Sequence, residues 1–403
     1  MAVAFRYIHE DTLNLLATDV AAHYMCAAGG AEEATNTTEA DAQALIRQAY
    51  TALNLGVTVA TLTGTYTATV TGRDSGVSGA LTVSLAAAGI TEDTSNTMTL
   101  ASGDLFNTVL ATSGIGHSEQ LILGGTAVTL QHATDGVCIL TTAGRATQPI
   151  STTATLFGVS GAMEHSSTTE ANKQRTFRTA ATLAKLFVRC TGASSPVSQT
   201  FTTRVNGAPG GQSVAPNAAG TFEDTSNTDT IAVGDEVNYR GVTSSGSFSL
   251  ILAQVQSTSS AKQHGIGAAN FNLTVDIFLN LNGGTSSTPT EADVETTMRT
   301  TNVLKNFYTY VSAYSLDVAA TARMRINRAD NALGVSPNAT GVWEDTSNTI
   351  TLVATDEANF NADAVAASSG SITCTVISVE ETQPVSDPFP TQSGFRHRVQ
   401  AFF

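Results

Sequence analysis

The chain contains few of the residues that membrane proteins, disulfide scaffolds and most enzymes require. Of its 403 residues only 13% are charged, four are cysteine, nine are proline and one is tryptophan. No apolar run approaches the roughly 18 residues of a membrane span. The segment from Met1 to Tyr7 lacks the basic region and apolar core of a secretory signal. We therefore expect assembly in a host cytoplasm, without a leader.

Positive charge is also scarce. The chain has 34 acidic and 19 basic residues, for a net charge of -15, and its basic residues are scattered singly. This balance argues against nucleic acid or an anionic membrane as the main partner.

Catalytic motifs are missing from the sequence. It has no Gly-x-Ser-x-Gly elbow, phosphate-binding loop or His-Glu-x-x-His pair. The seven histidines share no position in the repeat described below. We predict that the protein is not an enzyme and needs no cofactor.

What the chain does contain is an internal repeat. The hexapeptide Glu-Asp-Thr-Ser-Asn-Thr begins at Glu92, Glu223 and Glu344, at steps of 131 and 121 residues. The same steps align many other positions without a gap, including a Thr-Glu-Ala signature, two sets of arginines and the aspartates Asp104, Asp235 and Asp356. The aligned arginines are Arg47, Arg178 and Arg299, then Arg73, Arg204 and Arg325.

The repeat is the size of one compact domain. Abundant Thr and Val in alternating patterns, with turn residues at short spacing, indicate an antiparallel sandwich. We predict an all-β chain of three tandem β-sandwich (jelly-roll) modules. They cover residues 1–133, 134–262 and 263–390, followed by a tail at 391–403.

Within a module the sequence predicts an opening strand at Thr155 to Val159, a core strand through Leu186 and Cys190, and a strand from Gln199 closed by a turn at Gly207. Residues 39–53 are expected to form at most a short helix, capped by Thr38. The Ser, Thr and Gln-rich stretches 131–151 and 256–267 are predicted to be connectors.

The hexapeptide has two interpretations. Its carboxylates, at Asp93, Asp224 and Asp345, are candidate calcium ligands. The favoured alternative is a hairpin turn, because Asp, Ser and Asn bond to their own backbone in turns. The aligned arginines are expected to pair with these carboxylates inside a module.

The four cysteines do not repeat with the module. Cys26, Cys190 and Cys374 fall where sister copies carry apolar residues. We interpret the cysteines as small buried hydrophobes, with a disulfide or metal site as the alternative.

The tail combines basic and aromatic residues at the end of an acidic chain. We predict that Phe395, Phe402 and Phe403 bind a partner, together with contacts from the first third of the chain.

A succession of motifs resembles the jelly-roll modules of bacteriophage structural proteins, similar in architecture to the tumour-necrosis-factor and complement C1q fold. It comprises Leu183-x-x-Leu186-Phe187-Val188, Arg204-Val205-Asn206-Gly207, Gly220-x-x-x-Asp224-Thr225 and Val233-Gly234-Asp235. The resemblance implies a non-enzymatic shell, decoration, tail or fibre component of a virion, with trimer-like packing. Its partners would be copies of itself and other virion proteins. The three modules could form a pseudo-threefold cluster or a rod.

Two other functions remain open. An extracellular filament or surface protein would share this composition but should carry a leader or sorting signal. A glycan-binding adhesin, recognising a host-surface glycan, would need exposed aromatics, and the single tryptophan is Trp343.

Overall fold

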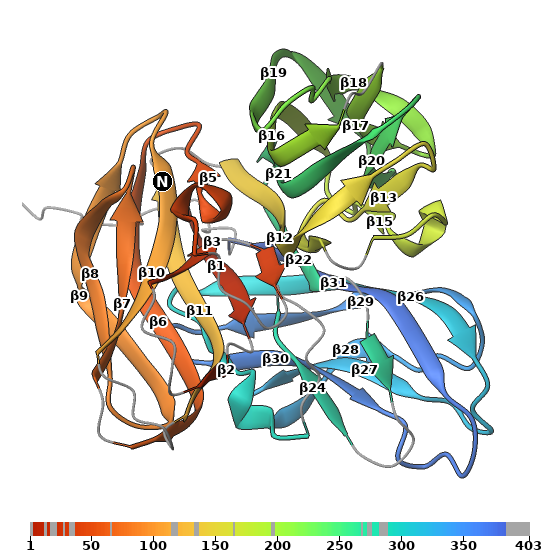
Figure 1. Ribbon diagram of the computed structural model, residues 1–403. Coiled ribbons are helices and arrows are strands. Elements are labelled where there is room, and N and C mark those ends of the chain that lie inside the picture. The colour runs from red at the N-terminus through yellow and green to blue at the C-terminus, as the bar shows by residue number, and fades with distance from the viewer. Residues whose placement is uncertain are drawn as a thin grey trace, which may run out of the picture.

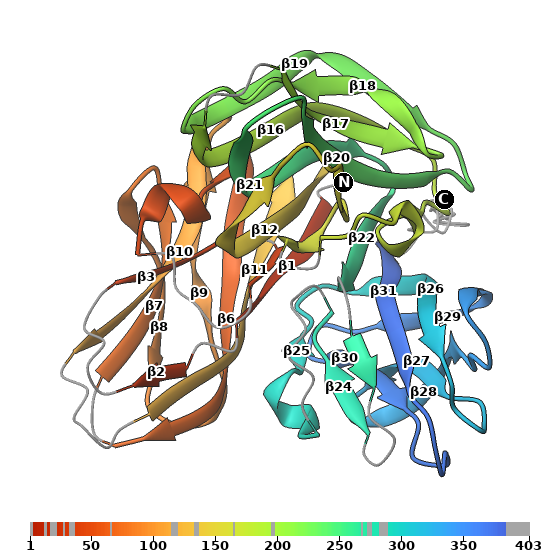
Figure 2. The ribbon, with the colours of Figure 1, turned by 45° about the vertical axis from the view of Figure 1, so that its right-hand side comes forward.

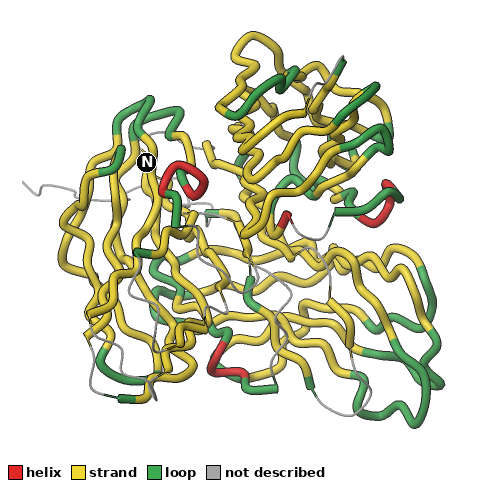
Figure 3. Tube along the Cα trace, viewed as in Figure 1, coloured by secondary structure: helices red, strands yellow, loops and turns green. Residues whose placement is uncertain are grey.

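Strands account for most of the chain (Figure 3). The computed structural model describes residues 3–11, 14–16, 22–26, 29–31, 37–64, 67–113, 120–132, 137–163, 166–194, 198–266, 269–271, 276–281 and 289–383. Within these residues the named helical elements are short 3-10 turns: η1 (Glu39–Ala42), η3 (Glu170–Asn172) and η4 (Glu291–Asp293). The predicted all-β class is confirmed.

The first module consists of two sheets. The larger has the order β4 (Gly29–Ala31), β1 (Val3–Asp11), β11 (Gln120–His132), β6 (Tyr50–Thr63) and β9 (Gly89–Leu100), with β2 (Asn14–Leu16) on β11. The smaller has the order β3 (His23–Cys26), β10 (Leu105–Ser113), β7 (Thr67–Asp74) and β8 (Val77–Leu85), with β5 (Ala44–Leu45) on β10.

The second module has the same two-sheet plan. Its larger sheet has the order β14 (Gly161–Ala162), β12 (Val137–Ile150), β21 (Ser247–Thr258), β16 (Ala181–Ser194) and β19 (Gly220–Ile231). Its smaller sheet has the order β13 (Thr155–Phe157), β20 (Glu236–Thr243), β17 (Gln199–Val205) and β18 (Ala208–Val214), with β15 (Arg175–Thr176) on β20.

The third module follows the plan again. Its larger sheet has the order β22 (Ala261–Ile266), β31 (Ile372–Thr382), β26 (Asn302–Tyr314) and β29 (Gly341–Leu352), with β23 (Ala269–Phe271) on β31. Its smaller sheet has the order β24 (Ile277–Leu279), β30 (Glu357–Asp363), β27 (Thr321–Ile326) and β28 (Ala329–Val335), with β25 (Thr296–Thr297) on β30.

The order of the strands is that of a double-sheet jelly roll. In each module the opening strand pairs with the closing strand, as β1 does with β11, and the chain passes repeatedly from one sheet to the other. Side chains alternate between core and solvent along β7, where Ala68 and Val70 are buried between threonines. Alternating Thr and small apolar residues therefore produce the half-buried sheets.

A tight hairpin joins the same two strands of the smaller sheet in every module. Asn206 and Gly207, between β17 and β18, both have positive φ, at 52° and 75°. Such a two-residue turn matches the twist of its strands and favours Asn-Gly. The predicted turn at Gly207 is thus confirmed.

The three modules surround a common centre near β1, β12 and β22 (Figures 1 and 2). Their buried apolar residues form two clusters: one runs continuously through the first and second modules, and the other lies mainly in the third. The second cluster also includes Ala127 of the first module. The modules are therefore joined in part by apolar residues that belong to shared core clusters.

Several predictions about local structure were wrong. The stretches 131–151 and 256–267 are not connectors, because they contain β12 and the end of β21 with β22. Their polar residues are buried at the centre, as Thr141 and Thr142 are. The predicted boundary at 262/263 falls inside β22. Thr155–Phe157 opens the smaller sheet and not the module, and Thr38 makes no side-chain cap bond to η1.

Candidate functional site at the interfaces between modules

The hexapeptide lies within one continuous strand of each larger sheet and does not form a hairpin. In the first module, Leu53 of β6 pairs with Thr97 of β9, and Leu55 of β6 pairs with Asp93 of β9. The three residues of β9 between these pairs therefore lie opposite the single residue Asn54 of β6. This is a β-bulge, and Asn54 has a positive φ of 53°. The hairpin prediction was wrong because β6 continues alongside both halves of the strand.

The aspartate of the hexapeptide stabilises this bulge. Asp93 Oδ1 accepts hydrogen bonds from the backbone N–H groups of Ser95 and Asn96, both at 3.1 Å. Its Oδ2 accepts the backbone N–H of Thr82, at 3.0 Å, from β8 in the other sheet. Asp224 and Asp345 make the same kinds of contact. Each aspartate thereby ties the two sheets together at one edge.

These donors also affect the acidity of the carboxyl group. Burial by itself raises the pKa of Asp93, but the hydrogen bonds from Thr82, Asn96 and Ser95 outweigh it and lower the pKa to about 2. The contacts of the calcium candidates Asp93, Asp224 and Asp345 are with N–H donors. Within the described residues, no group of three His, Cys, Asp or Glu side chains is placed to hold a metal ion.

The glutamate of each hexapeptide forms an ion pair across modules, with the arginine of the module before it in the ring. Arg47 of the first module contacts Glu223 of the second at 2.9 Å. Arg178 of the second contacts Glu344 of the third, with its Nε 3.0 Å from Oε1. Arg299 of the third contacts Glu92 of the first. Each module thus binds the next, and the third binds the first.

This closed ring gives the chain a pseudo-threefold arrangement. The interfaces are head-to-tail, because the arginine side of one module contacts the glutamate side of its neighbour. The turns η1, η3 and η4, which precede these arginines, lie against the larger sheet of the neighbouring module. Of the two arrangements that the sequence left open, the structure contains the cluster within one chain.

The second set of aligned arginines stays inside its own module. Arg73 forms an ion pair with Glu39 of the Thr-Glu-Ala signature, at 2.5 Å, and Arg325 pairs with Glu291, at 2.7 Å. Arg204 pairs with Glu170. The expectation that the arginines pair with hexapeptide carboxylates inside a module was therefore wrong for both sets.

Each interface has further contacts of its own. Between the first and second modules, Gln254 forms two hydrogen bonds with the backbone of Leu45. Between the second and third, Glu380 accepts the backbone N–H of Arg178 at 2.9 Å and the hydroxyl of Thr179 at 2.8 Å. These contacts are not repeated, so the three interfaces differ in detail.

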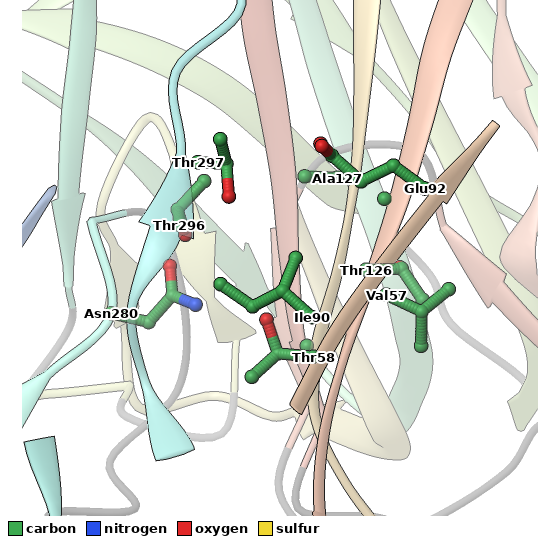
Figure 4. A pocket seen from close by; sticks show the side chains of 11 residues that line it. Val57, Thr58, Ile90, Glu92, Thr126, Ala127, Asn280, Thr296 and Thr297 are labelled. Atoms are coloured by element: carbon green, nitrogen blue, oxygen red, sulfur yellow. The ribbon is translucent and has the colours of Figure 1, made fainter. Parts of the chain in front are cut away.

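The interface between the third and first modules closes the ring, and we name it the seam. Thr58 donates its hydroxyl to the carbonyl of Glu295, at 3.1 Å. A small cavity of about 10 Å³ lies between Thr58 and Ala127 of the first module and Asn280 and Thr296 of the third (Figure 4). That volume is about enough for one water molecule. Ala127 occupies the repeat position that Gln254 has in the second module.

The centre of the ring is buried and polar. Lys262 lies over the ring of Tyr7, with its Nζ 4.5 Å from the centroid, and the Tyr7 hydroxyl accepts the backbone N–H of Ile139 at 3.0 Å. Burial lowers the pKa of Lys262 to about 8, although Glu381 and Cys138 act in the opposite direction. Residues from all three modules therefore meet here.

The three copies also differ in sequence at the centre. Phe5, Cys138 and Lys262 occupy the same position in their opening strands, as their pairing with the closing strands shows. An aromatic ring, a thiol and an amine thus replace one another, and all three are fully buried.

The remaining predicted residues lie elsewhere. The four cysteines are buried, as predicted for small hydrophobes. Trp343 donates its indole N–H to the carbonyl of Ala339, at 3.1 Å, and packs partly against the third module's core. The predicted partner residues Phe395, Phe402 and Phe403 lie outside the described residues. Within the part of the chain that the structure describes, no helix has the length and apolar character needed to cross a membrane.

No protein-family model matches the chain, and no curated protein matches it.

Proposed function

We propose that the chain is a non-enzymatic structural protein of a viral particle, which docks onto a larger assembly as one self-contained, trimer-like unit. The observation that carries this proposal is the ring of ion pairs, in which Arg47, Arg178 and Arg299 each contact the glutamate of another module. A single chain then presents three related surfaces, as a trimer would. Such a unit suits a place where three equivalent subunits of a shell meet.

The ring also weighs against a filament built through the same surfaces. A head-to-tail interface extends into a filament only when it stays open to the next chain. Here Glu92 and Arg299 satisfy each other within one molecule. The partners of the ring, including other virion proteins and further copies of the chain, would therefore bind to its outer surfaces.

Two measurements test this proposal. At low concentration and away from the particle, the purified chain should have the native mass of a monomer, because the ring closes within one chain. Particles released by the source should contain the chain at a fixed ratio to the main shell protein, and recombinant chain should sediment with particles that lack it. If the chain is absent from particles and fails to sediment with them, the proposal is overturned.

A further inference from the structure

The third module has a hydrophobic core of its own. The buried apolar residues of the first and second modules belong to one continuous cluster. Those of the third module form a second cluster, to which the described residues of the other modules contribute only Ala127. Two modules that share a core separate only by exposing it to water, whereas a module with its own core can leave its neighbours and stay folded. The third module is therefore the detachable part of the ring.

One repeat position shows the same difference at each interface. Phe187, Tyr308 and Gly56 are equivalent, because they pair with equivalent residues of the closing strands. Phe187 belongs to the shared core, and Arg47 of the first module lies over its ring, 5.9 Å from the centroid. Gly56 lines the small cavity at the seam and has no side chain to fill it. An aromatic ring thus closes the first interface, and the seam lacks one.

Polar contacts hold the third module to its neighbours. They are the ion pairs and hydrogen bonds described above: Arg178 with Glu344, Glu380 with Arg178 and Thr179, Arg299 with Glu92, and Thr58 with Glu295. Groups of this kind regain hydrogen bonds to water when an interface opens. Interfaces between domains that are polar in this way permit relative motion, unlike large apolar ones.

Docking of the third module also brings two buried cations together. Arg175 of the second module is 2% exposed, and its Nη1 donates to Ser160 Oγ at 2.6 Å. Its Nε has no hydrogen-bond partner in the part of the chain that the structure describes. Burial lowers the pKa of Lys262 in the third module, and the charge of Arg175 lowers it further. Burying a cation costs free energy, so this contact opposes docking.

The connection between the second and third modules is very short. β21 ends at Thr258 and β22 begins at Ala261, so Ser259 and Ser260 alone lie between the two strands. Short hinges of this kind favour exchange of a domain between copies of a chain. A third module that leaves its own ring finds the same receiving surfaces on the first and second modules of any other copy.

We propose that the third module exchanges between two copies of the chain, giving a closed dimer in which each third module completes the ring of the other chain. The partner is a second copy, because only the first and second modules of this chain carry the surfaces that the third module contacts. Every interface of the monomer is formed again in the dimer, and none stays open to add further chains. This contact between copies goes beyond the proposed structural role.

Charge substitutions placed on separate chains test the exchange. Arg299→Glu in one chain and Glu92→Arg in another each place like charges across the seam of a closed monomer. In an exchanged dimer of the two chains, the introduced glutamate meets the introduced arginine, and Arg299 meets Glu92. A concentrated equimolar mixture should therefore give one-to-one dimers of twice the 41.6 kDa chain mass. Native mass spectrometry with one chain isotopically labelled should find them at least tenfold more abundant than dimers of either variant alone.

A matched pair at the first interface is the control. Arg47→Glu and Glu223→Arg, mixed in the same way, should give no such enrichment, because the first and second modules share a core. Equal enrichment in both mixtures, random pairing of the two seam variants, or a seam mixture that stays monomeric would each overturn the proposal.

Hydrogen exchange on the parent chain gives a second reading that needs no variant to fold. Glu380 of the third module accepts the backbone N–H of Arg178, and Gln254 of the second accepts that of Leu45. The Arg178 amide should exchange at least tenfold faster than the Leu45 amide, because the third module detaches and the first two stay together. Equal exchange rates would contradict detachment. Neither experiment bears on particle association, which tests the proposed structural role.

Discussion

Gln254 of the second module holds both backbone groups of Leu45 in the first. Its Oε1 accepts the Leu45 N–H at 3.1 Å, and its Nε2 donates to the Leu45 carbonyl at 2.6 Å. Gln254 is fully buried, so its two hydrogen bonds with Leu45 are shielded from bulk water. A buried amide without a partner costs more than the net value of the bond that it loses.

Gln254→Ala is therefore expected to destabilise the chain by about 1–3 kcal/mol, because it leaves the N–H and carbonyl of Leu45 unpaired. Urea unfolding followed by circular dichroism measures the change. Ser378→Ala, at the equivalent position of the third module, is the control and should have a smaller effect. Equal effects of the two variants would contradict the role given to Gln254.

Gly124→Ala should weaken the seam. A Cβ at Gly124 in β11 would lie 1.8 Å from the carbonyl oxygen of Asp293 in η4, so the first and third modules could not approach as closely. We expect a loss of about 1–3 kcal/mol, as for other overpacked sites. Hydrogen exchange should show faster exchange in β11 and η4, whereas the interface between the first two modules keeps its protection. Uniform exchange behaviour would argue against a seam effect.

The ion pairs of the ring should differ in strength according to burial. The side chain of Glu92 is 7% exposed and that of Glu223 is 35% exposed. Exposed pairs contribute about 0–1 kcal/mol, and removing one partner of a buried pair costs more. Glu92→Gln should therefore lower the free energy of unfolding more than Glu223→Gln does. The double charge swap Arg47→Glu with Glu223→Arg should recover most of the stability that Arg47→Glu alone loses.

The hexapeptide aspartates predict a loss of stability in acid. The hydrogen bonds to Asp93 outweigh burial and hold its pKa at about 2, below the ordinary 3.8, and the pKa values of Asp224 and Asp345 are also lowered. Between pH ~2 and the ordinary pKa of 3.8, the folded state therefore binds fewer protons at Asp93 than the unfolded state does. This stabilisation is complete above pH ~4 and is lost as the pH falls towards ~2. Thermal unfolding across that range should show the loss, and Asp93→Asn should reduce its slope.

A buried polar network distinguishes the second module from the others. Asp229 Oδ2 accepts the hydroxyl of Thr203 at 2.6 Å and the side-chain amide of Gln212 at 3.0 Å. Gln212 in turn accepts the backbone N–H of Leu186 at 2.9 Å. The third module has the apolar residues Met324, Leu333 and Ile350 at the three side-chain positions.

Asp229→Ile alone should cost about 1–3 kcal/mol or more, because Thr203 and Gln212 lose their acceptor. The triple variant Thr203→Met, Gln212→Leu and Asp229→Ile reproduces the third module's set and should recover much of that loss. Chemical denaturation of the single, double and triple variants measures the coupling. If the triple variant loses the sum of the single losses, the three side chains do not act as a unit.

The sequence predicts the repeat frame and the all-β class well, because both depend on local pattern. The threonines and apolar residues that alternate in β7 and β17 define their strands, and Asn206-Gly207 defines its turn. The same repetition that reveals the frame hides the interfaces. Arg47 and Glu223 have counterparts in every copy, so sequence alone does not say whether an arginine pairs within its module or with the next one.

The strands at the centre of the ring were missed for a related reason. Residues 137–150 include three threonines, a glutamine, a glycine and a proline, a mixture typical of an exposed connector, yet they form β12. Polar side chains are buried there because the other modules supply their surroundings. The repeat steps of 131 and 121 residues do not align Phe5, Cys138 and Lys262, so their equivalence becomes visible only from the pairing of the opening and closing strands.

Those three residues also limit how the ring can be used. Three identical copies of the third module would place three lysines together in a buried centre, whereas one chain places a single Lys262 there beside Glu381. A homotrimer must carry the same residue at all three equivalent positions, whereas the fused ring can carry three different ones. The ring therefore has no exact symmetry axis. On a site with true threefold symmetry it could bind in three orientations that the site cannot distinguish, so symmetry-averaged maps of such an assembly would superimpose Phe5, Cys138 and Lys262 at one position.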